Sequence, residues 1–224
     1  MKQVINLDEY FDQIYCINLK SRPDRLLAFK KNFDALGTSK INIIEAVDGK
    51  TIDIGDWKYN SGALGCRLSH IAAYNDAIKN KYAKILVLED DVIINKGIKK
   101  ALFKLQQNLQ NNWDLIYFGG NHVIKPEKIN SEIVKIKCTL ATHAIAINCA
   151  CLPQIIAELE HNDHCIDVVL ADLHPKLRVY SPVKPVAYQK NGYSDIEETE
   201  VNYNVSFIKK IIFKIKKTLR NSNN

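Results

Sequence analysis

The sequence lacks both a long apolar run and an N-terminal secretory signal. No segment of its 224 residues approaches the ~18 apolar residues that cross a bilayer, and the opening MKQVINLDEY contains no long apolar stretch. The six cysteines are not spaced as a disulfide framework, and several lie inside apolar runs. We therefore expect buried, reduced thiols and a cytoplasmic protein.

Acidic residues are missing from positions 201–224, which carry six basic residues. The rest of the chain contains 25 basic and 25 acidic side chains, so the net charge of +6 belongs to this tail. A neutral body argues against nucleic acid as a partner, because nucleic-acid-binding domains carry a basic face. With 46% apolar and 25% charged residues, the pattern predicts one globular domain over 1–200 and a basic tail over 201–224.

Within the tail, residues 207–220 have the pattern of a basic amphipathic helix. Its apolar face would comprise Ile208, Ile211, Ile212, Ile215 and Leu219, and lysines with Arg220 occupy most of the remainder. Such a helix suits an anionic membrane surface, and we expect it to bind one. The alternative is a helix that packs on its own domain and leaves its basic face in solvent.

Short apolar runs alternate with segments of helical periodicity along the body of the chain. The runs that predict strands cover 13–19, 41–44, 84–88, 114–118 and 143–147, and helical spacing covers 26–36 and 62–78. Strands that alternate with helices are typical of an α/β fold with a largely parallel sheet flanked by helices.

One stretch, KILVLEDDVIIN at 84–95, places three adjacent carboxylates directly after the most apolar predicted strand. Ligands of open α/β sheets bind at the carboxyl ends of strands, so Glu89, Asp90 and Asp91 should emerge at that edge. In an extended segment Glu89 and Asp91 would point to one side and Asp90 to the other. Carboxylates so placed suit Mg²⁺ or Mn²⁺, although a solvated acidic turn would also explain them.

Six segments, taken in order, resemble glycosyltransferase family 25, which contains bacterial lipooligosaccharide galactosyltransferases and collagen galactosyltransferases. They are YCINLKSRPDR at 15–25, IIEAVDGK at 43–50, GALGCRLSHIAAYNDAI at 62–78, ILVLEDDV at 85–92, DLIYFGG at 114–120 and THAIAI at 142–147. The resemblance implies a GT-A-like, Rossmann-related fold. It also implies transfer of a hexose, galactose first, from a UDP-sugar to a hydroxyl of a glycan or glycolipid acceptor such as lipooligosaccharide. Because the bacterial members of the family use lipid-linked acceptors, we expect this protein at the cytoplasmic face of a membrane.

The resemblance also implies roles for individual residues. Glu89 and Asp91 would hold Mn²⁺ or Mg²⁺ against the donor diphosphate, with Asp91 as the first candidate for a direct ligand. The implied donor-binding residues are Asn18, Arg22, Asp24, Arg25, Val47, Asp48, Gly49, Ser69, His70 and Asp90. The two guanidinium groups suit phosphate through their planar fork of donors.

Simpler structural roles remain open for several of these residues. Arg25 could pair with Asp24 or a helix neighbour on the surface. Gly49 could be only a turn residue. His70 could equally be a hydrogen-bonded histidine of the core.

The family's enzymes invert the anomeric centre, which requires a base to take the acceptor proton. Asp167, before an apolar helix, is the first candidate for this catalytic role, and Asp195 in a loop that could close over the donor is the second. An N-cap would explain Asp167 equally well.

Three other interpretations stay open. His161, His164, Cys165 and His174 are close in sequence, but their spacing matches no common zinc site, and we expect a polar loop. A metal-dependent phosphoryl-transfer enzyme would also place acidic residues at a strand end. A non-catalytic protein that binds nucleotide-sugars or glycans could retain the same fold.

Overall fold

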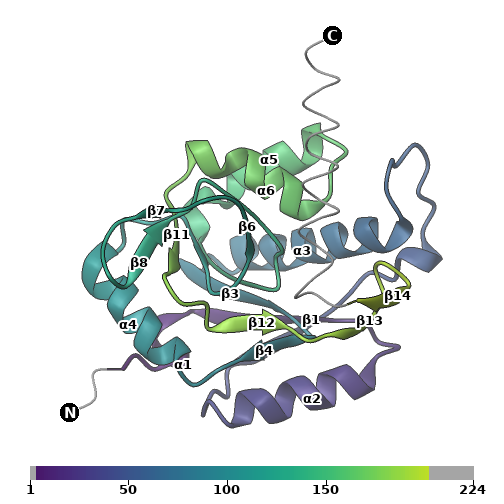
Figure 1. Cartoon of the computed structure of the whole chain (residues 1–224). Coiled ribbons are helices and arrows are strands. Elements are labelled where there is room, and N and C mark those ends of the chain that lie inside the picture. Colours follow the sequence, from purple (N-terminus) through teal and green to yellow (C-terminus); the bar gives the residue numbers. More distant parts are fainter. Residues whose placement is uncertain (1–3, 202–224) are drawn as a thin grey trace.

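The computed structural model describes residues 4–201, so the predicted amphipathic helix over 207–220 lies outside the described residues. An eight-stranded sheet forms the centre of the molecule (Figure 1). Its strands, in spatial order, are β2 (Ile41–Glu45), β1 (Gln13–Asn18), β3 (Lys84–Glu89), β10 (Ala144–Asn148), β5 (Leu115–Tyr117), β11 (Val179–Pro182), β8 (Ile133–Lys135) and β7 (Glu127–Lys128).

Six of these strands run in one direction, and β10 and β8 run against them. The α/β fold with a mixed, largely parallel sheet is therefore confirmed. The insertion of antiparallel β10 between β3 and β5 was not predicted, because an apolar run fixes the burial of a strand and not its direction.

Helices cover both faces of the sheet, and the alternation of β3 shows how (Figure 1). Ile85 and Val87 pack on one side with α3 (Ser61–Lys79), α5 (Leu152–His161) and α6 (Ile166–Leu173). Leu86 and Leu88 pack on the other with α1 (Leu7–Tyr10), α2 (Pro23–Asp34) and α4 (Ile98–Leu109). All four β3 side chains have no exposed surface, which anchors the carboxyl end of this strand.

Three two-stranded ribbons and three short 3₁₀ turns complete the fold. The ribbons are β4 (Val92–Ile94) with β12 (Ala187–Gln189), β6 (Asn121–Ile124) with β9 (Cys138–Leu140), and β13 (Gly192–Ser194) with β14 (Thr199–Val201). The turns are η1 (Gly49–Thr51), η2 (Cys149–Cys151) and η3 (His174–Lys176). Among residues 4–201, no helix has both the length and the apolar character to cross a membrane.

Candidate active site

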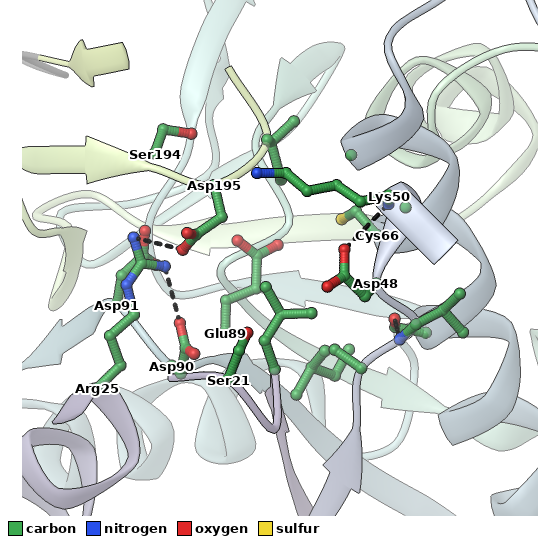
Figure 2. Close-up of a pocket in the computed structure, with 18 of the residues that line it drawn as sticks. Ser21, Arg25, Asp48, Lys50, Cys66, Glu89, Asp90, Asp91, Ser194 and Asp195 are labelled. Carbon is green, nitrogen blue, oxygen red and sulfur yellow. Dashed lines mark hydrogen bonds and ion pairs between the residues drawn. The ribbon is translucent and has the colours of Figure 1, made fainter. Parts of the chain in front are cut away.

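A pocket opens at the carboxyl ends of β1 and β3 and encloses about 900 Å³ of space, its solvent-filled mouth included (Figure 2). The parallel strands β1, β2 and β3 end together here, where ligands of open α/β sheets bind. Nine of the predicted site residues line it: Arg25, Val47, Asp48, Gly49, Ser69, Glu89, Asp90, Asp91 and Asp195. Arg25 and Asp195, 170 positions apart in the sequence, therefore meet around one pocket.

Glu89 is the last residue of β3, and its carboxylate is held from the α3 side. Its Oε1 accepts a hydrogen bond from the Thr142 hydroxyl at 2.7 Å and lies 3.4 Å from His70 Nε2. Its Oε2 accepts from the Gln189 amide at 3.4 Å. Burial opposes ionisation of Glu89, but the contacts with His70 and Thr142 outweigh it and lower the pKa of the carboxyl group.

Asp90 turns to the opposite side of the sheet, toward α2. Its carboxylate accepts hydrogen bonds from Asn18 Nδ2 at 2.6 Å and from Arg25 Nη1 at 3.2 Å. Strand β3 ends at Glu89, and Asp90 and Asp91 form the turn that follows it. Asn18 therefore stands behind a pocket carboxylate and does not itself line the cavity.

Asp91 carries the least satisfied carboxylate of the three. Its Oδ1 is buried and has no hydrogen-bond partner within the described part of the chain. Burial, followed by the negative charges of Glu89 and Asp90, raises the pKa of Asp91 to about 8. An unpaired buried oxygen that is subject to the negative charges of two other carboxylates fits a hard divalent cation, which would supply the missing partner and offset the repulsion.

Two arginines of the segment that opens α2 meet the loop after β13. Arg22 donates from Nη1 to Asp195 Oδ2 at 2.5 Å, and Arg25 Nη2 lies 3.2 Å from the same oxygen. Arg25 also pairs with Asp90, as Figure 2 shows, whereas Arg22 binds the exposed Asp24 at 2.9 Å. The alternative considered for Arg25, a surface pair with Asp24, is not the arrangement found, because Asp24 pairs with Arg22.

The loop after β2 lies directly against the first turns of α3. Ser69 Oγ accepts the backbone N–H of Val47 at 2.8 Å and donates to the Gly65 carbonyl at 2.6 Å. A Cβ added at Gly65 would come within 2.4 Å of the Val47 carbonyl oxygen, and one at Gly49 within 2.0 Å of the Ser61 carbonyl oxygen. Gly49 therefore does more than make a turn, since both glycines permit backbone contact between the loop and α3.

His70 and Asp167 are also absent from the pocket wall. His70 is fully buried behind Glu89, with its Nδ1 3.3 Å from the Tyr74 hydroxyl. Asp167 lies in the first turn of α6, where Cys165 is the N-cap, so the N-cap role weighed for Asp167 is wrong. Burial raises the pKa of Asp167, and hydrogen bonds from the backbone of Ala141 and Val168 partly offset that rise.

The histidines of 161–174 do not converge on a site. His161 Nδ1 contacts the Ala157 carbonyl at 2.6 Å, and His164 Nδ1 contacts the Tyr59 hydroxyl at 2.6 Å. His174 contacts the Tyr117 hydroxyl at 3.0 Å. Each of these rings has its own hydrogen-bond partner, as a polar loop and a packed core require.

Residues 11–148 match the model of glycosyltransferase family 25, described as an LPS biosynthesis protein. The match covers more than half of the chain and contains the strand and carboxylates that build the pocket floor. The chain belongs to glycosyltransferase family 25.

Relatives of this family 25 chain include proteins named as galactosyltransferases and proteins named as inactive. Human procollagen galactosyltransferase 2 is 36% identical over 141 residues, which are 53% of this chain and 22% of that protein. A glycosyltransferase 25 family member of Aedes aegypti is 32% identical over 126 residues, 47% of this chain and 21% of that protein. The human inactive glycosyltransferase 25 family member 3 is 29% identical over 149 residues, 53% of this chain and 23% of that protein. The matches thus span less than a quarter of each relative.

Among solved structures, similarity extends to a glycosyltransferase involved in the glycosylation of the major capsid of PBCV-1. The TM-score is 0.49 at 14% identity, over 83% of this chain and 95% of that one. The structure of A197 from STIV gives a TM-score of 0.46 at 14% identity, over 84% and 92% of the two chains.

Several residues of the family 25 site were not assigned a role from the sequence. Thr142 lies in the quoted THAIAI segment, and its hydroxyl is the shortest contact of Glu89. Gln189 reaches the same carboxylate from β12, and Lys50 pairs with Glu198 at 3.0 Å across the pocket mouth. Nothing local in the sequence marks Gln189 or Glu198, since both act only through contacts made by folding.

Proposed function

We propose that this family 25 chain is a hexosyltransferase that moves a hexose from a UDP-sugar to a hydroxyl of a glycan or glycolipid acceptor. Galactose is the first candidate for the hexose, because the human relative is named a galactosyltransferase. Lipooligosaccharide is the first candidate for the acceptor, in line with the family description as an LPS biosynthesis protein. The observation that carries the proposal is the buried, unpartnered Asp91 oxygen in a pocket that also contains Arg25.

Glu89 and Asp91 are the residues that would hold Mn²⁺ or Mg²⁺ in this proposal. A bound cation of this kind stabilises the negative charge that grows on a diphosphate leaving group. The free oxygen of Asp91 supports its role as the direct ligand. Glu89 already has partners on both oxygens, which supports a weaker or water-mediated role for it.

The donor would lie across the pocket with its diphosphate near the arginines. Val47, Asp48 and Gly49 line the end of the pocket beside β2 and would contact the nucleoside. Arg22 and Arg25 would bind phosphate oxygens through the same N–H groups that now bind Asp195. A carboxylate and a phosphate carry the same sign of charge, so the donor must displace Asp195 from the arginines.

Asp195 is the favoured catalytic base of the proposal and Asp167 the second candidate. Asp195 lines the pocket, whereas Asp167 is not among the lining residues. As the acceptor oxygen attacks the anomeric carbon and UDP departs, the base takes the proton of that hydroxyl. Binding of the donor would break the contacts of Asp195 with Arg22 and Arg25. The Asp195 carboxylate would then be available to the acceptor hydroxyl.

We also propose that the chain acts at the cytoplasmic face of a membrane, through residues 207–220. The six basic residues of the tail support attraction to anionic lipid. Sedimentation with vesicles of phosphatidylglycerol and phosphatidylcholine tests this point. The full chain should sediment in low salt, and a chain that ends at residue 201 should stay in solution. Equal sedimentation of the two chains would contradict the role of the tail.

The function is tested by incubating the purified chain with UDP-, GDP- and CMP-sugars and with Mn²⁺, Mg²⁺ or a chelator. UDP-galactose should release UDP and free or transferred hexose, and the chelator should stop the reaction. Release of inorganic phosphate without hexose would indicate phosphoryl transfer instead. Binding of UDP without turnover of any sugar nucleotide would place the chain with the relatives named inactive.

A further inference from the structure

A cluster of sulfur, nitrogen and oxygen atoms lies at the α3 side of the pocket. Cys66 and His70 are one turn apart on α3, and Glu89 ends the neighbouring strand β3. One ligand atom from each residue lies within 4.8 Å of the other two. Among residues 4–201, this is the one group of three such side chains that comes so close.

The histidine and the carboxylate of this cluster are held in place from behind. His70 has no exposed surface, and its Nδ1 lies 3.3 Å from the Tyr74 hydroxyl, which leaves Nε2 directed at Glu89. Thr142 fixes the Glu89 carboxylate by a hydrogen bond of 2.7 Å. Metal-binding histidines are oriented in this way, through a hydrogen bond at the second ring nitrogen.

The cluster is open on the side that a cation would enter. Cys66 and Glu89 both line the pocket, and Figure 2 shows them facing its interior. Tetrahedral Zn²⁺ with bonds of about 2.0–2.3 Å places its ligand atoms about 3.5 Å apart. The three side chains therefore need to close by only about 1 Å, and a fourth position would face the pocket.

The ligand set differs from the one expected for the donor metal. A cysteine sulfur and an imidazole select Zn²⁺, Co²⁺ or Cd²⁺, whereas Mg²⁺ prefers oxygen ligands alone. Asp91 offers oxygen alone and lies outside the cluster.

We propose that Cys66, His70 and Glu89 form a binding site for a thiophilic divalent cation of the zinc class. The thiol proton passes to solvent when the sulfur binds the cation. Because Glu89 lies in this site and also faces the donor pocket, occupancy of the site inhibits transfer. The binding itself is independent of the proposed function, and only the inhibition rests on it.

Titration of the full, purified chain with Co²⁺ alone tests the binding. One equivalent of Co²⁺ should produce two signals, a sulfur-to-cobalt charge-transfer band and the strong visible absorption of a tetrahedral cobalt ion. Addition of Zn²⁺ should remove both signals. Cys66→Ser should abolish the charge-transfer band, and His70→Gln should weaken Co²⁺ binding by about tenfold or more. The control Cys138→Ser removes a partly exposed thiol outside the pocket and should retain the band. Circular dichroism spectra that match the wild type show which variants are folded.

The band should also persist in Asp91→Asn, which separates this site from the proposed donor metal. Absence of the band in the wild type, or its persistence in a folded Cys66→Ser, overturns the site. In a transfer assay, half-inhibition by Zn²⁺ should need about tenfold more Zn²⁺ in Cys66→Ser than in Cys138→Ser. If the chain proves inactive, the proposed function fails while the cobalt titration still decides the site.

Discussion

The Asp195 carboxylate accepts a hydrogen bond of 2.5 Å from Arg22, a residue 173 positions earlier in the chain. The same oxygen lies 3.2 Å from Arg25, so one carboxylate occupies both guanidinium groups. This carboxylate stands where a phosphate of the proposed donor would bind. The proposed donor would have to replace the contacts of Asp195 with these two arginines.

Asp195→Asn should change donor binding and turnover in opposite directions. Loss of the negative charge frees Arg22 and Arg25, so UDP should bind about threefold to tenfold more tightly by isothermal titration calorimetry. Loss of the proposed base should lower kcat by about 100-fold or more.

Glu200→Gln is the matched control, since Glu200 is an exposed carboxylate on strand β14 of the same ribbon. It should leave both UDP affinity and kcat near the wild-type values. Weaker UDP binding by Asp195→Asn would show that Asp195 supports the site and does not compete with the donor.

Gly65→Ala should displace the loop after β2. The new methyl group would approach the Val47 carbonyl oxygen to 2.4 Å, and this oxygen belongs to the backbone, which cannot move aside as a flexible side chain can. We expect a loss of about 1–3 kcal/mol in the free energy of unfolding, measured in urea, together with weaker UDP binding. Gly97→Ala is the control, because its methyl group would come close only to the end of the Asn95 side chain and would meet Val186 at an ordinary contact distance of 3.6 Å. Equal stability of the two variants would contradict the close contact between this loop and α3.

The ion pair between Asp114 and Arg178 should make the stability difference between the wild type and Asp114→Asn depend on pH. Burial of Asp114 opposes ionisation, but hydrogen bonds from the Arg178 side chain and backbone outweigh it and lower the pKa of the carboxyl group. A group with a lowered folded-state pKa stabilises above its unfolded pKa, about 3.9 for Asp, and loses this contribution as pH falls through the folded pKa. Asp114→Asn should therefore cost about 1–2 kcal/mol near pH 7 and progressively less below about pH 4.

Urea unfolding at a series of pH values measures this difference. Glu127→Gln is the control, because Glu127 and its partner Lys137 are both more than half exposed at a separation of 3.7 Å. It should change stability by less than about 0.5 kcal/mol at either pH. A cost of Asp114→Asn that stays constant down to about pH 3 would contradict the assigned ion pair.

The location of the carboxylates could be predicted from the sequence, because it depends on local pattern. The apolar run 84–88 identifies a buried strand. Ligands of open α/β sheets bind at the carboxyl ends of strands, so the residues that follow this run are expected at a ligand-binding edge. The structure has this strand as Lys84–Glu89, with Asp90 and Asp91 in the turn. Four of the six family segments, at 15–25, 43–50, 62–78 and 85–92, contribute residues that line the pocket.

The partners of those carboxylates could not be predicted, because they depend on long-range packing. Asp90 meets Arg25 and Glu89 meets Thr142 only after α2 and β10 have packed on the sheet. Periodicity does not report strand direction or the side from which a loop returns. The pairing of Asp195 with Arg22 and the approach of Cys66 to Glu89 therefore required the structure.

Release of UDP from UDP-galactose by the wild type and by Asp91→Asn tests whether Asp91 anchors a metal-dependent transfer of hexose. With Mn²⁺ present, we expect turnover by the wild type, loss of turnover with chelator, and a fall of about 100-fold or more in Asp91→Asn. Asp53→Asn, which removes an exposed loop carboxylate, should behave as the wild type. Unchanged turnover in Asp91→Asn would contradict the role of Asp91 as a metal ligand.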